Sequence, residues 1–505
     1  MSIVLINPNL VVQKSDPLTT GVVYMPVTLA YTAGALRGAG VPFKVIDSYG
    51  LAPLKARAVG AFWWFGLSAA DILARLPSDP TAFILYAINL TNHLSTVAIA
   101  RSLKQAFPQV PLVILENPHA VTAYSLNEVK AEFFAAGADF ILTGNSERSA
   151  VELAHCWSGA LPVDSYREIA GLGTREFYNP PRPAYELDAL PYPAWELFPL
   201  ANYWRLRFAH GPLTGRRYLP LLTSRGCPYA CRFCVTPAVA ERHWLGREAA
   251  AVVDEMGHWQ KTLGVDEFHI EDLNPTVSEE RIRTMCQAII DRGLKLTWKL
   301  VAGTKAETIK SAATVELMAR AGCRYVSISP ETGSPRVLQA MNKPFDVPHA
   351  LGLLGWLRAA GIFSQVCFVI GFPGEEDADR ELTAALVRTA VRQGADEIAL
   401  FLATPVPGSA IFKELNGYRS LSELNFSPVW RADYARLNAF RGRLYLRFLW
   451  WKFWCRPGAL LVQPGRFLAR RFATKMEMVP YRAIVLAVAG RWGHFIASLK
   501  GEKAL

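Results

Sequence analysis

The sequence predicts an α/β protein with a doubly wound, Rossmann-like N-terminal domain, a partial (β/α)6 barrel and a C-terminal helical region. Three observations carry this prediction. Apolar runs of strand length alternate with helix-length segments over residues 1–157 and again from residue 218, as in parallel sheets covered on both faces. A proline-rich stretch separates the two series. At 505 residues, 51% of them hydrophobic, the chain is long enough for about three domains.

The first series predicts a doubly wound sheet over residues 1–157. Its strand-like runs cover residues 3–6, 43–46, 83–88, 112–115 and 140–142, and helical segments cover 28–40, 93–107, 126–136 and 146–157. Polar residues follow several of these runs, and loops at the carboxyl ends of parallel strands are where such sheets bind ligands. The segment Phe62-Trp63-Trp64-Phe65 fits neither pattern, and its place in the fold stays open.

Residues 158–216 are predicted to be an extended linker. Six prolines lie close together there and exclude regular helix and central strand: Pro180, Pro181, Pro183, Pro191, Pro193 and Pro199. Six further strand-like runs follow, at residues 218–223, 267–270, 296–300, 325–328, 363–369 and 397–401. They predict a partial barrel over residues 217–415, with the active site at the C-terminal ends of its strands.

The net charge of +11 is concentrated at one end of the chain. Residues 441–505 hold thirteen Lys and Arg but two Glu, whereas the charges of residues 1–440 sum to zero. Eight cysteines are too few for a disulfide-stapled secreted protein, no basic segment precedes the first apolar run, and no uninterrupted apolar stretch reaches the ~20 residues of a membrane span. We therefore expect a cytoplasmic protein with a basic, aromatic-rich helical region at 416–505, which contacts the inner face of the membrane through residues 441–505.

Three cysteines within eight residues give the sharpest chemical signal. Cys227, Cys231 and Cys234 directly follow the first barrel strand, and such spacing in a cytoplasmic chain favours a metal over disulfides. A structural zinc site needs a fourth ligand at paired spacing. The loop does not supply one, because the next candidate, His243, is nine residues further on. Three thiolates suit a [4Fe–4S] cluster that keeps one iron open. Chance clustering or a zinc knuckle is the alternative.

The spacing Cys-x-x-x-Cys-x-x-Cys, with Phe233 before the third cysteine, resembles the radical S-adenosylmethionine (SAM) superfamily. Further segments resemble its later strand motifs in order: His269-Ile-Glu271-Asp272, Thr304-Lys305-Ala-Glu307, Ser329-Pro-Glu331-Thr-Gly333, Gly371-Phe-Pro373-Gly374-Glu375 and Pro405-Val-Pro407-Gly408-Ser409. The resemblance implies that the open iron chelates SAM and that an electron cleaves it to a 5′-deoxyadenosyl radical, which abstracts a substrate hydrogen.

The same resemblance implies roles for six residues around SAM. Phe233, Glu331 and Gly371 would contact it, Glu271 or Asp272 would bind its ammonium or the substrate, and Lys305 would lie nearby. The alternative for Glu271, Asp272 and Glu331 is that they are ordinary polar side chains at strand ends that do not bind SAM. The alternative for Lys305 is that it is an ordinary exposed lysine.

The N-terminal domain and the linker resemble the cobalamin-binding subgroup of this superfamily. Gly144-Asn145-Ser146-Glu147 resembles a Gly-Glu-x-Glu loop in which Asn145 replaces the first Glu. The Asp-x-His-x-x-Gly motif that supplies an axial histidine is absent after the first strand, so a domain without cobalamin stays an open alternative. The candidate cobalamin-binding residues are Asn7, Asn9, Asn89, Glu116, Asn117, Gly144 and Glu147. His119 is interpreted as a solvated or core histidine.

The basic C-terminal region interleaves charge with aromatic and aliphatic residues. This composition fits an anionic membrane surface or single-stranded nucleic acid, and a helical hairpin packed on the barrel is the plainer alternative. The density of large aliphatic residues favours the membrane over nucleic acid. The five cysteines outside the motif are interpreted as small buried hydrophobes: Cys156, Cys286, Cys323, Cys367 and Cys455.

These observations predict a radical SAM enzyme that methylates an unactivated carbon of a hydrophobic, lipid-like or natural-product substrate with cobalamin. It would take electrons from a flavodoxin- or ferredoxin-type donor. The alternatives are radical cyclisation, oxidation or C–C bond formation on a tetrapyrrole or isoprenoid lipid, and a non-catalytic protein that uses the cluster structurally. An RNA-modifying relative, such as a tRNA methylthiotransferase, is disfavoured because only Cys156 precedes residue 227.

Overall fold

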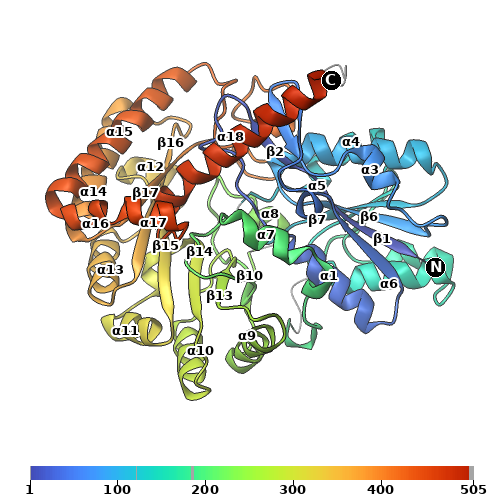
Figure 1. The fold of residues 1–505 in the computed structure, drawn as a ribbon, viewed down its shortest axis with the longest axis horizontal. Coiled ribbons are helices and arrows are strands. Elements are labelled where there is room, and N and C mark those ends of the chain that lie inside the picture. Colours follow the sequence, from blue (N-terminus) through green and yellow to red (C-terminus); the bar gives the residue numbers. More distant parts are fainter. Residues whose placement is uncertain (1, 121, 183–186, 241, 500–505) are drawn as a thin grey trace.

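Two six-stranded sheets organise the chain, and the last helix runs from the barrel-like sheet to a small three-stranded sheet beside the N-terminal domain (Figure 1). The computed structural model describes residues 2–120, 122–182, 187–240 and 242–499. The predicted fold class is confirmed: an N-terminal α/β domain precedes a parallel barrel-like sheet and a helical C-terminal region.

The N-terminal sheet has the order β3-β1-β6-β7-β8-β9 and is parallel except for its last strand. Its strands are β1 (Ile3–Asn7), β3 (Phe43–Asp47), β6 (Ala82–Ala87), β7 (Leu112–Glu116), β8 (Phe140–Leu142) and β9 (Leu172–Gly173). Alternate residues enter opposite layers: Ile3 and Leu5 pack with α1 (Val27–Gly38) and α6 (Glu147–Ser158), whereas Val4 and Ile6 pack with α4 (His93–Ala106) and α5 (Leu126–Ala135). The strand order reverses at β1, and this creates a crevice at the carboxyl edge.

The unplaced Phe62–Phe65 segment is strand β5, the middle of a small antiparallel sheet. It pairs with β2 (Leu10–Gln13) and β4 (Ala56–Val59) beside the N-terminal domain. The ring of Trp63 lies against Gly490, where an added Cβ would fall 2.5 Å from a ring atom. The aromatic run therefore forms a docking surface for the last helix, a role that no local pattern indicates.

The linker is more structured than the prolines suggest. It contributes β9 to the N-terminal sheet and helix α7 (Leu200–Leu206). Its extended part runs along α1, where Ala194 donates a backbone hydrogen bond to Ala30 and a Cβ on Gly34 would fall 2.4 Å from the carbonyl oxygen of Tyr192. The domain divisions at residues 157, 216 and 415 stay a prediction.

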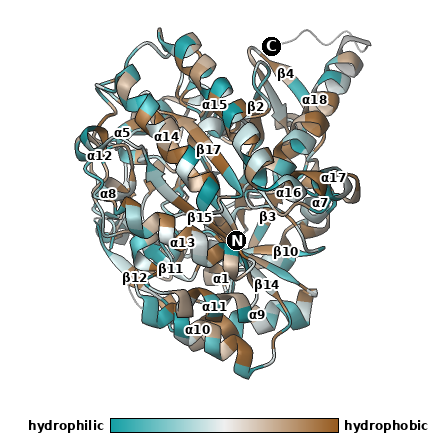
Figure 2. Ribbon diagram, turned by 90° about the vertical axis from the view of Figure 1, so that its left-hand side faces the viewer, coloured by the Kyte–Doolittle hydropathy of each residue, from teal (hydrophilic) through white to brown (hydrophobic). Residues whose placement is uncertain are grey.

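The second sheet is fully parallel and keeps its strands in chain order without closing. Its strands are β10 (Tyr218–Leu221), β13 (Glu267–Ile270), β14 (Thr297–Thr304), β15 (Cys323–Glu331), β16 (Phe363–Ile370) and β17 (Glu397–Leu402). The main covering helices are α9 (Ala249–Leu263), α10 (Glu279–Asp291), α11 (Ala312–Arg320), α13 (Val347–Ala359) and α14 (Asp377–Gln393). Figure 2 shows the amphipathic pattern, with hydrophobic strands inside and a largely hydrophilic α10 outside.

Four helices form the C-terminal region: α15 (Tyr434–Cys455), α16 (Pro457–Leu461), α17 (Gln463–Ala469) and α18 (Lys475–Leu499). Part of its positive charge is internal, because Arg441, Lys452 and Arg482 are buried. Lys452 donates to the carbonyl oxygen of Asp396 at 2.5 Å, and Arg482 donates to that of Leu18 at 2.8 Å. These cations dock the region onto the barrel and the N-terminal domain.

Among the described residues, no helix combines the length and apolarity needed to cross a bilayer. Four of the five cysteines outside the motif are buried, as expected, whereas Cys455 at the end of α15 is exposed. The expectation for Cys455 was wrong because its side chain faces solvent at the last residue of α15, although Lys452 near the same end is buried against the barrel.

Candidate active site

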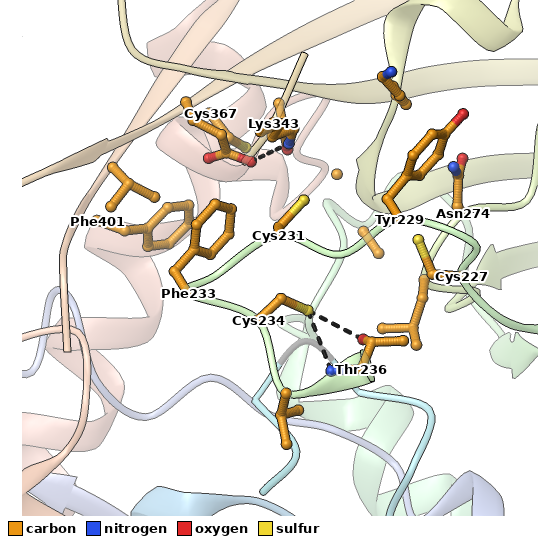
Figure 3. Close-up of a pocket in the computed structure, with 18 of the residues that line it drawn as sticks. Cys227, Tyr229, Cys231, Phe233, Cys234, Thr236, Asn274, Lys343, Cys367 and Phe401 are labelled. Atoms are coloured by element: carbon orange, nitrogen blue, oxygen red, sulfur yellow. Dashed lines mark hydrogen bonds and ion pairs between the residues drawn. The ribbon is translucent and has the colours of Figure 1, made fainter. Parts of the chain in front are cut away.

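A cavity of about 420 Å³ lies at the C-terminal ends of the barrel strands. The loop carrying Cys227, Cys231 and Cys234 forms one wall, and the three thiols surround a common space (Figure 3). Apolar side chains make up much of the remaining wall, among them Val301, Val369, Phe401, Leu402 and Phe426.

The cysteine loop is held by backbone contacts on both sides. It lies between the two strands of a short antiparallel ribbon, β11 (Ser224–Gly226) and β12 (Trp244–Gly246). The backbone N–H of Arg232 donates to Met341 at 3.0 Å, and Asn342 donates from its side chain to the carbonyl oxygen of Ala230 at 2.9 Å. Gly226 has a φ of +75°, and a Cβ there would fall 1.9 Å from the carbonyl oxygen of His243. The turn into the loop therefore requires glycine.

Gly226→Ala should disrupt the loop far more than an alanine at another left-handed glycine. Gly293 is the matched control because its φ is +63° and its Cβ position is open. Both variants lose about 1–2 kcal/mol to the left-handed backbone, and only Gly226→Ala adds the clash. We expect iron and sulfide binding after anaerobic reconstitution to fall sharply in Gly226→Ala and to persist in Gly293→Ala. Equal iron contents would show that the loop tolerates the side chain.

Three thiolates on one loop suit a cluster better than a single ion. Zinc–sulfur bonds of about 2.3 Å would bring the sulfurs to roughly 4 Å from one another, whereas a [4Fe–4S] cluster binds each thiolate to a different iron. Within the described part of the chain, no three His, Cys, Asp or Glu side chains are grouped to hold one metal ion. Burial raises the pKa of Cys231 to about 12, so iron must displace its proton on binding.

Glu331 and Lys343 form a buried ion pair at the wall of the cavity. Glu331 ends β15 with a φ of +67°, a conformation that costs about 1–3 kcal/mol for a non-glycine residue and is concentrated at functional sites. Burial raises the pKa of Glu331, and the Lys343 ammonium opposes that rise. The role of Glu331 toward SAM stays a prediction. Lys343 was missed as a site residue because its pairing is a tertiary contact.

Phe233 and Lys305 also line the cavity, as the resemblance implied. The Lys305 ammonium lies 4.4 Å from the ring centroid of Tyr229, which stands between the first two cysteines, and 3.8 Å from Glu307. Lys343 lies 5.9 Å from the ring centroid of Phe233. Two cations thus stand over aromatic rings of the cysteine loop.

The other three predicted SAM contacts lie outside the lining. The Asp272 carboxylate accepts hydrogen bonds of 2.6–2.7 Å from Thr223 and Ser224, which holds the turn before the cysteine loop. Gly371, with a φ of +75°, accepts a 3.0 Å bond from Arg431. Glu271 lies beside the cavity. Their roles toward SAM stay predictions.

Glu271 belongs to a polar group at the inner end of the cavity. Its carboxylate accepts a 2.6 Å hydrogen bond from His210 Nδ1, and Lys475 Nζ lies 3.4 Å from the other ring nitrogen of His210. Lys475 also donates to the carbonyl oxygen of Val301 at 2.8 Å. His210 and Lys475 were missed because they enter the barrel from the linker and from α18, far from any motif.

The candidate cobalamin residues gather at the carboxyl edge of the N-terminal sheet, and most of their polar atoms have partners within the protein. Asn7 donates to Asp47 at 2.7 Å, and Asn9 donates to the carbonyl oxygen of Leu67 at 2.9 Å. Asn89 accepts from the backbone of Asn92, and Asn117 donates to the carbonyl oxygen of Ile88.

The remaining three candidates, Glu116, Gly144 and Glu147, take part in hydrogen bonds or ion pairs with neighbouring segments. Glu116 accepts 2.9 Å hydrogen bonds from the backbones of Leu126 and Gly144, and Glu147 pairs with Arg225. The two small cavities at the edge measure about 20 and 10 Å³.

Four buried polar atoms at this edge have no hydrogen-bond partner in the described structure: Asn7 Oδ1, Tyr49 Oη, His119 Nε2 and Ser146 Oγ. Such orphaned atoms suit a polar ligand, whereas a corrinoid is far larger than these cavities. The donor set therefore fits cobalamin in chemistry, and binding requires the edge to open.

Glu116 should make stability depend on pH. Burial raises its pKa from 4.5 to about 7. The folded chain thus binds more protons than the unfolded chain between these values, so the free energy of unfolding falls by about 3 kcal/mol as pH rises through this window. Glu116→Gln should flatten this fall, measured by urea unfolding at about pH 5 and about pH 8. The exposed Glu128→Gln is the control, and an unchanged pH difference in Glu116→Gln would contradict the assignment.

Comparisons with known proteins agree with this site. The profile of the radical SAM superfamily matches residues 221–387. The chain is 27% identical to cytidylyl-2-hydroxyethylphosphonate methyltransferase of Streptomyces wedmorensis over 82% of its length and 81% of that protein. It is 26% identical to the anaerobic magnesium-protoporphyrin IX monomethyl ester cyclase of Cereibacter sphaeroides, over 82% of this chain and 64% of that one.

A solved structure shares the fold. The radical SAM methyltransferase TsrM of Kitasatospora setae, with cobalamin and a [4Fe–4S] cluster bound, superposes with a TM-score of 0.59 at 19% identity, covering 82% of this chain and 74% of TsrM. The radical SAM domain implies the cluster and SAM as cofactors. The chain therefore contains a radical SAM domain at residues 221–387 and is a radical SAM enzyme.

Proposed function

We propose that the enzyme methylates an unactivated carbon of a hydrophobic, lipid-like or natural-product substrate in a cobalamin-dependent radical reaction. The observation that carries the proposal is the barrel cavity, which combines the cysteine loop with walls of Val369, Phe401 and Leu402. The similarity to methyltransferases over four-fifths of the chain supports methyl transfer.

The residues of the cavity would have separate roles. Cys227, Cys231 and Cys234 would hold the cluster, at which reductive cleavage of SAM supplies the hydrogen-abstracting radical. Glu331 and Lys343 would orient the amino acid part of SAM, and the apolar walls would exclude water from the radical. The carboxyl edge of the N-terminal sheet would hold cobalamin, which carries the methyl group.

The overall reaction balances without a further co-reactant. A substrate R–H, two SAM and two electrons give R–CH3, methionine, 5′-deoxyadenosine and S-adenosylhomocysteine. A flavodoxin- or ferredoxin-type protein would supply the electrons. Both SAM molecules are consumed, one as the radical source and one as the methyl donor.

A second candidate is an oxidative radical reaction without methyl transfer, such as a cyclisation. The closed carboxyl edge favours it, because cavities of about 10 and 20 Å³ cannot admit a corrinoid without rearrangement. In this case one SAM is consumed, and the electron returns from the substrate radical to the cluster. The similarity to a cyclase agrees with this candidate.

The optical spectrum and the products of turnover separate the two candidates. The protein would be produced with cobalamin available and reconstituted anaerobically. Corrinoid absorption together with equal amounts of 5′-deoxyadenosine and S-adenosylhomocysteine supports methylation. Formation of 5′-deoxyadenosine alone, in protein without corrinoid, supports the second candidate, and absence of both products contradicts each of them.

A further inference from the structure

Six of the large apolar side chains that the C-terminal helices expose to solvent lie on α15, α16 and α17. Leu446, Trp450, Phe453 and Trp454 belong to α15, Leu461 ends α16 and Leu468 lies in α17; we call this set the C-terminal ridge. Leu461 and Leu468 are 77% and 82% exposed. Neither α16 nor α17 contains a buried residue, so these two helices pack little of their apolar surface against the protein.

Helix α15 has two apolar faces, and only one of them is covered. Leu444 and Phe448 are buried in the main core. Leu446, Trp450 and Phe453 fall within about 60° of one another on the opposite side, at about 100° per residue. A helix needs a single apolar face to dock on its own protein, so the second face is suited to another partner.

The surroundings of the ridge are positively charged. Arg443 and Arg447 are exposed on α15, where Arg447 pairs with Glu381 of α14 at 3.2 Å, and Arg470 and Arg471 are exposed directly after α17. The only acidic residue between positions 441 and 499 is Glu477, which is buried and bonded to Arg466 at 3.1 Å. No exposed carboxylate between positions 441 and 499 therefore offsets these arginines, and Glu381 of α14 is the partner of Arg447.

We propose that the C-terminal ridge docks the enzyme onto an anionic membrane surface. Its tryptophans and leucines would enter the headgroup region, where amphipathic aromatic rings partition, while the arginines bind anionic headgroups. This geometry needs no spanning helix. The proposal is independent of the reaction, and it would bring the cavity close to lipid-like substrates.

A second copy of the chain and nucleic acid are the other possible partners of the ridge, and each fits it less well. In a two-fold dimer formed through the ridge, Arg470 and Arg471 of both copies would be brought together without an exposed carboxylate from residues 441–499 to compensate them. Nucleic acid would pair with the arginines but leave Leu461 and Leu468 in water. A bilayer with anionic lipid satisfies both features at once.

The test is flotation of the full chain with vesicles. We expect it to float with phosphatidylcholine vesicles that contain phosphatidylglycerol and to float less with phosphatidylcholine alone. Trp450→Ser/Leu461→Ser/Leu468→Ser should lower partition at least about tenfold, since each side chain loses apolar burial in the interface. Arg470→Gln/Arg471→Gln should lower partition to anionic vesicles by about tenfold or more and weaken its salt dependence.

Matched controls exclude a general effect of surface change. Leu18→Ser/Leu54→Ser removes exposed leucines from the N-terminal domain, and Arg388→Gln/Arg392→Gln removes exposed arginines from α14. Both controls should float like the parent. Deletion of residues 441–505 is unsuitable because it removes the buried Phe448 and Arg482. Absence of flotation, equal loss in the controls, or a dimer in sedimentation that the ridge variant abolishes would each overturn the proposal.

Discussion

The Cys231→Ala/Cys234→Ala variant is expected to lose the iron–sulfur cluster and all SAM-dependent formation of 5′-deoxyadenosine. The two thiols lie on the wall of the barrel cavity, and one remaining cysteine cannot hold a cluster that needs three protein ligands. The measurements are iron and sulfide per chain, the visible absorption of the cluster, and 5′-deoxyadenosine after addition of a reductant. Activity should fall to the level of the reaction without enzyme.

Two other cysteines provide controls. Cys455 is exposed at the end of α15, and Cys455→Ala should retain both cluster and activity. Cys367 lies deeper in the cavity, 3.4 Å from Ser327 Oγ, so Cys367→Ala should retain the cluster and alter only substrate turnover. Formation of 5′-deoxyadenosine by the double variant at the parental rate would contradict the assignment of the cysteine loop.

The fold could be predicted from the sequence where its signals are local. Buried parallel strands are continuous apolar runs, so the five parallel strands of the N-terminal sheet and all six barrel strands were expected within a few residues of their observed positions. Strand β5 and the two-residue β9 could not be predicted, because their pairing depends on partners distant in the chain.

The same contrast between local signals and distant packing applies to the residues of the candidate site. The three cysteines lie in one loop, so their spacing alone indicates a shared site. Glu331 ends β15, and the resemblance to the family is what indicates it. Lys343, His210 and Lys475 reach the cavity only through tertiary packing, and Lys475 arrives from a helix that the sequence indicated as a basic appendage. The net charge overstates the surface charge of the C-terminal region for the same reason. Arg441, Lys452 and Arg482 are counted in it but are buried in the structure.

Loss of the ion pair between Glu147 and Arg225 is expected to be the most destabilising single change in the N-terminal half. Glu147 Oε1 lies 2.6 Å from Arg225 Nη2, and the two side chains are 1% and 3% exposed. Removing one partner of a buried pair leaves an uncompensated charge, which costs about 3–5 kcal/mol. We expect Glu147→Ala and Arg225→Ala each to lower the free energy of unfolding by about this amount.

The position of the pair makes the prediction specific. Glu147 begins α6 of the N-terminal domain, whereas Arg225 lies in β11, two residues before Cys227, so the pair links that domain to the cysteine loop. Either variant should therefore also lower cluster retention. In the double variant the losses should be less than additive, because the second substitution removes the charge that the first one left unpaired.

The neighbouring surface pair supplies the control. Arg148 lies 3.2 Å from Glu152 and is 63% exposed, so Arg148→Ala should change stability by less than about 1 kcal/mol. Glu147 was predicted to bind cobalamin, and a pure ligand role gives a different outcome: Glu147→Ala would retain stability and cluster and lose only corrinoid. Urea unfolding and iron content, measured on the same preparations without corrinoid, distinguish these two roles. A residue that joins two domains affects both quantities in such protein, whereas a residue that only binds the cofactor affects neither.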